Sequence, residues 1–104
     1  MKPDKILSML GLAAKAGAVV SGEFSTEKSV KEGKAFLVIV AEDASENTKK
    51  MFRNMTTFYE VPMYTYSSKE MLGHAIGKEF RASLAINNES FASNIEDKIK
   101  AQII

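Results

Sequence analysis

The sequence predicts an α/β fold: a three-layer α/β/α sandwich around a mixed, mostly parallel sheet of about four strands. Helical and strand-like patterns alternate along the chain with no linker, repeat or low-complexity tract between them. The apolar run 35–41 (AFLVIVA) shows no polar alternation, which is typical of a central strand covered on both faces. A chain of 104 residues suits one such core. We therefore expect a single domain over residues 1–104.

Composition narrows the classes of function. The apolar share of 45% and the charged share of 26% are typical of a soluble globular chain. The absence of cysteine excludes disulfides, thiolate metal sites and a cysteine nucleophile, and a lone histidine, His74, argues against a histidine-based metal site. We expect no cofactor, no metal and no membrane association, and a monomer in a reduced, cytoplasmic setting. The net charge of +1 means that RNA binding would need a local basic patch.

The first half of the chain predicts two helices and two strands. Pro3 and Asp4 suit the first turn of a helix, and Gly17 suits its end. Gly33 suits the C-terminal cap of a second helix. The expected elements are a helix through Ile6, Leu7, Leu10 and Ala14, a strand over 18–20, a helix over 23–32 and the buried strand over 35–41.

The second half predicts three helices and two strands. Ser45 suits the N-cap of a third helix, and Ser67 to Glu70 form a capping box before a fourth. The expected elements are a helix through Met51 and Phe52, a strand over 63–66, a helix over 69–76, a strand over 82–86 and a closing helix with Phe91, Ile95 and Ile99 on one face.

The candidate catalytic residues do not form an active site. Glu42 and Asp43 follow the buried strand, but adjacent strand residues point to opposite sides, so turn chemistry before the helix cap explains them better. His74 lies within a helix with no predicted acid or nucleophile beside it. The spacing of Gly73 and Gly77 suggests close packing of that helix against the sheet. We therefore expect a protein that is not an enzyme.

The second helix has two distinct faces. Thr26, Ser29, Val30 and Gly33 follow helical spacing and predict the face that packs on the sheet. Lys28 lies about 200° around the helix from Thr26. The outer face therefore carries Ser25, Lys28 and Lys31, and Lys34 follows the cap.

Gly22 leaves the start of this helix open, with free backbone N–H groups that can receive a phosphate or a base edge. An ordinary solvated surface is the alternative. Glu27 and Lys31 suit an i, i+4 ion pair, and Glu23 and Glu27 themselves complement the helix dipole. From these residues alone the solvated surface is the stronger interpretation.

Several segments carry a family resemblance. They are Gly22–Gly33 ahead of KAFLVIVAEDAS, the run LGHAIGKEFRASLAI over 72–86, and the stretches LGLAAKAGAVVSGE and GKAFLVIVAEDASENTKK. Together, and in this order, they resemble the kink-turn RNA-binding ribosomal proteins of the L7Ae/L30e group, above all its short bacterial YlxQ-type branch. The resemblance covers most of the chain and implies an α/β/α fold.

The resemblance also implies an RNA site at the start of the second helix. The family motif there is a glycine, then Thr-Asn-Glu, with a lysine six residues after the glycine. Gly22 and Lys28 match, whereas Glu23, Phe24 and Ser25 depart from it. Phenylalanine can stack on a base but cannot hydrogen-bond its edge, and serine offers only a hydroxyl. The departures therefore imply weaker binding to a standard kink-turn.

A loop after the fourth helix completes the implied site. In the family it packs against an extruded nucleotide, and residues 77–82 occupy its place here. Phe80 matches an apolar contact, and Arg81 can stack on a base or pair with phosphate. The alternative is that Phe80 caps the core and Arg81 is solvated. The implied RNA-binding residues are Gly22, Glu23, Phe24, Ser25, Lys28, Lys31, Lys34, Phe80 and Arg81.

These observations predict a non-catalytic protein that binds structured RNA, with ribosomal RNA as the expected partner. The alternative is a protein-interaction module of the same fold that associates with the ribosome. In that case RNA binding is weakened or lost, and the region around Phe24 docks a ribosome-associated protein.

Overall fold

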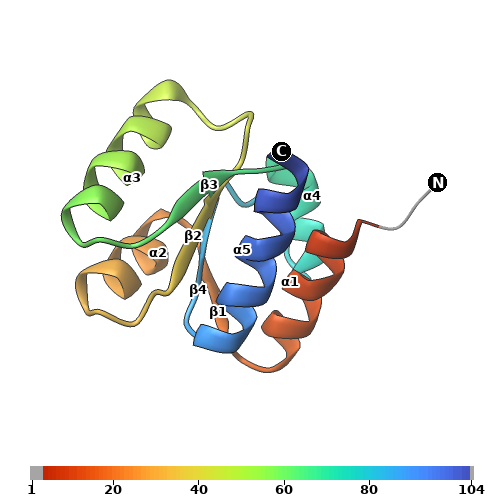
Figure 1. The fold of residues 1–104 in the computed structure, drawn as a ribbon. Coiled ribbons are helices and arrows are strands. Elements are labelled where there is room, and N and C mark those ends of the chain that lie inside the picture. Colours follow the sequence, from red (N-terminus) through yellow and green to blue (C-terminus); the bar gives the residue numbers. More distant parts are fainter. Residues whose placement is uncertain (1–3, 104) are drawn as a thin grey trace.

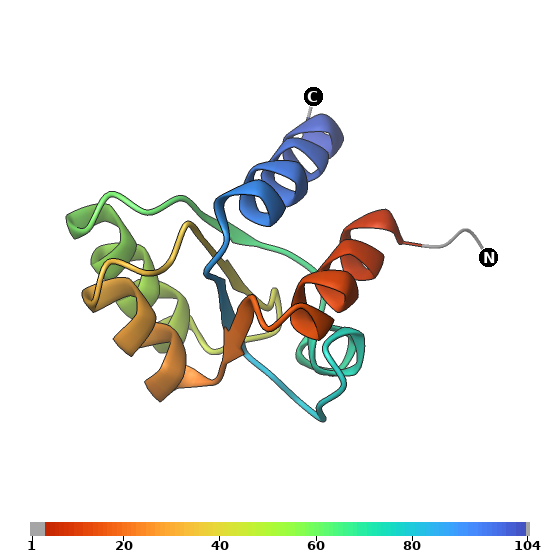
Figure 2. The same cartoon turned by 90° about the horizontal axis from the view of Figure 1, so that it is seen from below.

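A four-stranded sheet lies between two layers of helices in the computed structural model, which describes residues 4–103 (Figure 1). Helices α2 and α3 cover one face, and α1 and α5 cover the other with α4 beside α1 (Figure 2). This confirms the predicted three-layer α/β/α sandwich. The elements in order are α1 (Lys5–Lys15), β1 (Val19–Ser21), α2 (Glu23–Lys31), β2 (Leu37–Val40), α3 (Glu46–Phe58), β3 (Met63–Thr65), α4 (Lys69–Ala75), β4 (Ser83–Ile86) and α5 (Glu89–Ile103).

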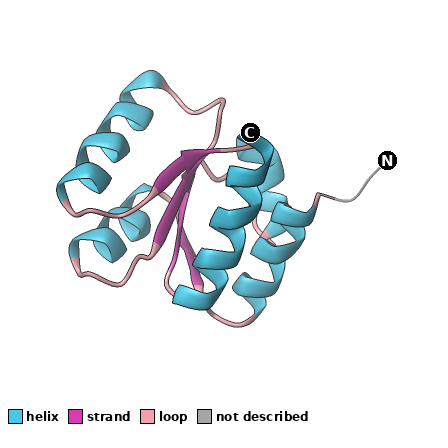
Figure 3. Ribbon diagram, in the orientation of Figure 1, coloured by secondary structure: helices cyan, strands magenta, loops and turns pink. Residues whose placement is uncertain are grey.

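The strands form one sheet at the centre of the molecule (Figure 3), in the order β1-β4-β2-β3. β2 pairs with β3 in parallel, with Val38 opposite Met63. β4 pairs antiparallel with both β1 and β2. The prediction of a mixed four-stranded sheet is confirmed, but the prediction that it is mostly parallel is wrong. Alternating helices and strands predict parallel crossovers, and they do not reveal that the last strand enters between β1 and β2 in the opposite direction.

The core lies on both faces of the two central strands. All residues of β2 and β4 are buried, as a central strand without polar alternation predicts. Helices on both sides add apolar side chains that are completely buried, and each contributes roughly 1.5–3 kcal/mol to folding. These side chains are Ile6 and Leu10 of α1, Phe52 of α3, Leu72 of α4 and Ile95 of α5.

Side-chain caps set the starts of three helices. Oδ1 of Asp4 accepts hydrogen bonds from the backbone N–H groups of Ile6 and Leu7, both at 2.9 Å, so Asp4 is the N-cap of α1. Asp4 therefore lies just before the first turn of α1, whereas the sequence predicts it within that turn. Pro3 lies outside the described residues. Ser45 caps α3 as predicted.

The start of α4 differs from its prediction. The hydroxyl of Ser68 accepts a hydrogen bond from the N–H of Met71 at 3.1 Å. Ser68 is thus the N-cap, and Met71 occupies the position at which a capping box needs Glu or Gln. The predicted box with Glu70 is therefore wrong, although a serine does begin the helix.

Within residues 4–103, none of the helices has the length and apolar character needed to cross a membrane.

Candidate nucleic-acid interface

β1 leads into α2 through a single residue, Gly22. Its φ of 92° and ψ of 158° lie in a region that essentially only glycine adopts. Its N–H donates to the carbonyl of Ser83 at 3.0 Å, which fixes the turn against β4. A Cβ at this position would meet nothing within 4 Å, and no side chain caps the helix. The N-terminus of α2 is therefore open to solvent.

The buried face of α2 is largely as predicted. Thr26, Ser29 and Val30 are buried, and the hydroxyl of Ser29 bonds to the side-chain oxygen of Asn87. Gly33 is exposed, so its assignment to this packing face is wrong. Its φ of 74° ends the helix in the left-handed conformation that glycine adopts readily.

The outer face of the first turns carries an aromatic ring and a cation. The side chain of Phe24 is 77% exposed. Lys28 is also exposed and has no carboxylate within salt-bridge distance in the described part of the chain. Glu23 is exposed at the first turn, where its carboxylate is stabilised by the helix dipole, and Ser25 is half-buried.

Lys31 and Lys34 lie away from this opening. Lys31 is nine residues beyond Gly22, about 13 Å along the helix axis. Its ammonium lies 2.7 Å from the carboxylate of Glu27, whose hydrogen bond and charge raise the pKa of Lys31. Lys34 lies 3.2 Å from Glu32. The structure therefore gives both lysines acidic partners and does not bring them to the start of α2.

Arg81 does lie beside the start of α2. Its Nε donates to Oγ of Ser21 at 3.0 Å, and one terminal nitrogen donates to the carbonyl of Phe80 at 2.8 Å. Arg81 is half-buried, whereas Phe80 is 65% exposed and does not cap the core. The bond to Ser21 attaches the 77–82 loop to the residue before Gly22, and the bond to Phe80 lies within the loop. Two aromatic rings and a guanidinium thus lie on the segments that meet at this opening.

Gly73 supports this loop instead of packing on the sheet. A Cβ on Gly73 would lie 1.1 Å from the carbonyl oxygen of Glu79. The carbonyl of Gly73 accepts a hydrogen bond from the N–H of Lys78 at 2.8 Å. The predicted packing of this glycine against the sheet is therefore wrong, because the loop that carries Phe80 folds back onto it.

Sequence reasoning missed Ser21 as a member of this site. Ser21 ends β1, and its hydroxyl positions the guanidinium of Arg81. No local pattern could pair the two residues, because they are 60 positions apart. The antiparallel pairing of β1 with β4 brings them together.

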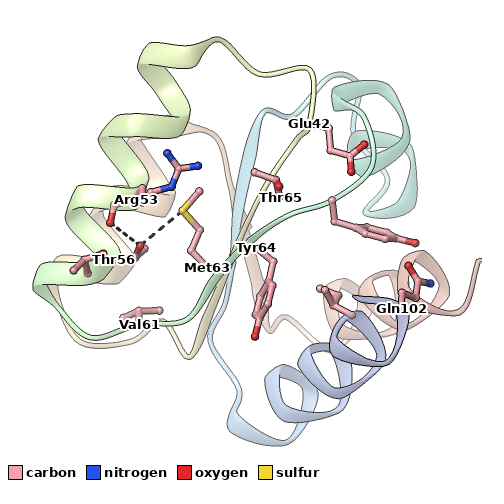
Figure 4. Close-up of a pocket in the computed structure, with 11 residues that line it drawn as sticks. Glu42, Arg53, Thr56, Val61, Met63, Tyr64, Thr65 and Gln102 are labelled. Carbon is pink, nitrogen blue, oxygen red and sulfur yellow. Dashed lines mark hydrogen bonds between the residues drawn. The ribbon is translucent and has the colours of Figure 1, made fainter. Parts of the chain in front are cut away.

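Glu42 and Asp43 do not converge on a catalytic site. The expected turn is present, because the N–H of Ala44 donates to the carbonyl of Ala41 at 3.1 Å across these two residues. Oδ1 of Asp43 accepts a hydrogen bond from the N–H of Lys69 at 2.8 Å, a long-range contact with the start of α4. Glu42 instead lines a cavity of about 590 Å³ along β3, together with Arg53 of α3 and Gln102 of α5 (Figure 4). Within residues 4–103 there is no group of three or more His, Asp or Glu that could hold a metal ion.

The fold and this surface define a small α/β/α domain with an open helix start and exposed aromatic side chains beside it. The chain belongs to the Ribosomal protein L7Ae/L30e/S12e/Gadd45 family, whose model matches residues 4–96. The resemblance expected from the sequence is thereby confirmed.

Three relatives illustrate the family. The RNA-binding protein YlxQ of Bacillus subtilis is 40% identical over 87 residues, which are 84% of this chain and 87% of that protein. The RNA-binding protein YlxQ of Enterococcus faecium is 36% identical over 93% of each chain. The large ribosomal subunit protein eL30 of Methanoregula boonei is 40% identical over 68% of this chain and 71% of that protein.

Two solved structures share the fold. A protein of unknown function from Bacillus halodurans superposes with a TM-score of 0.92 at 35% identity, covering 94% of this chain and 99% of that one. The 15.5kD RNA binding protein of Giardia lamblia has a TM-score of 0.79, with 97% of this chain and 92% of that chain covered. At 23% identity, the second likeness concerns the fold alone.

Proposed function

We propose that this protein is a non-catalytic RNA-binding protein that holds structured RNA between the start of α2 and the 77–82 loop. The observation that carries the proposal is the hydrogen bond from Arg81 to Ser21, which fixes the loop beside the open helix start at Gly22. The names of the YlxQ relatives support RNA as the ligand. The eL30 relatives support ribosomal RNA, and hence a cytoplasmic setting.

Each side chain then has a physical role. The free N–H groups at the start of α2 and the ammonium of Lys28 bind phosphate. The exposed rings of Phe24 and Phe80 stack on unpaired bases. Replacing such a ring with alanine commonly costs about 1–3 kcal/mol of binding free energy per stacked base. Arg81 pairs with phosphate or stacks, because its hydrogen bonds hold its guanidinium in place.

Gly22 gives the RNA access to the helix start because no side chain can project there without backbone strain. The hydroxyl of Ser25 and the carboxylate of Glu23 face base edges as donor or acceptor groups. The carboxylate repels phosphate, so it favours a base over the backbone at its position. Lys31 and Lys34 act only as distant, largely neutralised charges.

Standard kink-turns are weak ligands in this proposal. Phe24 and Ser25 replace an amide and a carboxylate that would pair with base edges. A ring can stack on any of the bases, whereas hydrogen bonds to a base edge select a particular base. The protein therefore prefers RNA in which an unstacked base lies beside a bent or bulged backbone.

Titration of ribosomal RNA fragments at several salt concentrations tests the proposal. With roughly two or three phosphates contacted, the log–log salt slope should be about −2 to −3. Lys28→Ala should weaken binding and make the slope shallower by about one unit. Lys31→Ala is the matched control, because Lys31 lies on the same helix but is paired with Glu27. Weak binding that is independent of salt and of both variants would contradict the proposal and favour the protein-interaction module.

A further inference from the structure

A groove runs between α1 and α4 and ends beside the 77–82 loop of the proposed RNA surface. Two hollows of about 640 and 340 Å³ share four lining residues and form one continuous depression. Its floor is backbone, because a Cβ on Gly11 would lie only 3.0 Å from the carbonyl oxygen of Ala75. Figure 2 shows the two helices side by side. The shared residues are Gly11, Lys15, His74 and Ala75.

The walls of the groove are aliphatic and unusually exposed. Leu12 on α1 is 54% exposed and Met71 on α4 is 46% exposed, and Leu7 is half-buried between them and the core. Among the described residues, the exposed imidazole of His74 on α4 is the one ring that lines both hollows. The aliphatic walls accept the aliphatic side chains of a partner.

In the part of the chain that the structure describes, the groove carries one charged side chain whose hydrogen-bonding groups are unused. Among the described residues, Asp4 is the only carboxylate that lines it, and both of its oxygens are occupied. Oδ1 caps α1, and Oδ2 accepts a hydrogen bond from the hydroxyl of Tyr66 at 2.6 Å. Lys15, at the other end, has no carboxylate within salt-bridge distance in the described chain. The groove thus presents apolar walls and one unpaired cation.

We propose that this groove binds a short amphipathic helix of a partner protein, with its aliphatic side chains between Leu12 and Met71 and a carboxylate on Lys15. From Leu7 to Lys15 the groove follows α1 for about 12 Å, which corresponds to two turns of a bound helix. Side chains at i, i+3 or i+4 and i+7 would fill such a length. The groove ends at Gly77, where the 77–82 loop begins, so the partner lies beside bound RNA and not over it. This goes beyond the proposed RNA binding.

Photo-crosslinking in cells tests the proposal with the full-length chain. The crosslinkable residue p-benzoylphenylalanine replaces Leu12, and in a matched control it replaces Lys50, an exposed residue of α3 on the opposite face of the sheet. Crosslinked segments are identified by mass spectrometry. We expect the Leu12 probe, and not the Lys50 probe, to capture an amphipathic segment that carries an acidic residue. Capture of RNA, of a second copy of this chain, or of nothing above the Lys50 control would overturn the proposal.

Affinity measurements then test whether Lys15 pairs with a carboxylate of the partner. A synthetic peptide of the captured segment should bind the parent protein, and Lys15→Glu should weaken that binding about five- to tenfold. Lys50→Glu makes the same change of charge on the opposite face and should have no effect. Equal affinity for the parent and Lys15→Glu, with equal melting temperatures, would overturn the assignment of Lys15. Titration of RNA onto Lys15→Glu should match the parent, which separates this groove from the RNA surface.

Discussion

Gly73→Ala should loosen the 77–82 loop while the rest of the protein remains folded. The added Cβ would lie 1.1 Å from the carbonyl oxygen of Glu79, whereas ordinary contact begins at 3.4 Å. The loop must therefore move by about 2 Å. That shift breaks the 2.8 Å hydrogen bond from Lys78 to Gly73 and strains the 3.0 Å bond from the N–H of Arg81 to the carbonyl of Lys69. We expect a loss of about 2–3 kcal/mol in the free energy of unfolding.

Helix propensity alone predicts the opposite result. Alanine in a helix interior is favoured over glycine by about 1 kcal/mol, so a net loss would identify the close approach as its cause. Urea unfolding measures the change in the free energy of unfolding, with Glu70→Ala as a control at an exposed position of the same helix. RNA titration should show weaker binding as well, because Phe80 and Arg81 move with the loop. A Gly73→Ala protein that is as stable as the parent and binds RNA equally well would refute the reasoning.

Three further predictions follow from other parts of the structure. Lys28→Ala should change the free energy of unfolding by less than about 0.5 kcal/mol, whereas Val30→Ala, at a buried position, should cost about 2 kcal/mol in urea unfolding. Phe24→Asn combined with Ser25→Glu should strengthen binding to a standard kink-turn in calorimetry, by about 1–3 kcal/mol for each base-edge contact restored; a folded double variant without any gain would show that the motif is aligned wrongly. Burial, followed by a hydrogen bond to a carboxylate, raises the pKa of Tyr66 to about 12 from its ordinary value near 10. Because the folded state keeps Tyr66 protonated, its contribution to the free energy of unfolding is complete below pH 10 and is lost as the pH rises through 12. In the parent the free energy of unfolding should therefore fall at alkaline pH, and Tyr66→Phe should reduce that fall by up to about 2 kcal/mol. Identical alkaline unfolding curves for the two proteins would contradict that assignment.

Most features that depend on neighbours in the sequence follow from local patterns. The serine cap at Ser45, the packing face with Thr26 and Val30, and the stop at Gly33 all follow from patterns a few residues long, whereas the cap of α4 lies at Ser68, one residue after the predicted box begins. The ion pair between Glu27 and Lys31 was also foreseen, as the alternative to a charged RNA surface. Local rules were sufficient because one helical turn brings these groups together.

Features that depend on contacts distant in the sequence could not be predicted. The reversed direction of β4 leaves no mark on its own residues, since a buried strand has the same composition in either direction. The bond between Ser21 and Arg81 depends on that direction. The contact of Gly73 with Glu79 depends on how the loop returns toward the sheet, and the spacing of Gly73 and Gly77 indicates a close approach without identifying its neighbour.

The central position of β4 has a consequence for how the chain folds. Its residues pair with β1 partners more than 60 positions earlier in the sequence, as Ser21 does with Leu84. During synthesis β1 and β2 therefore emerge before β4, and the edges that pair with β4 remain unpaired until it has been synthesised. High contact order of this kind slows folding, because the entropy of closing a long loop is lost before the stabilising contacts between its ends can form. The RNA surface itself is completed only at that moment, because the same strand brings Arg81 to Ser21.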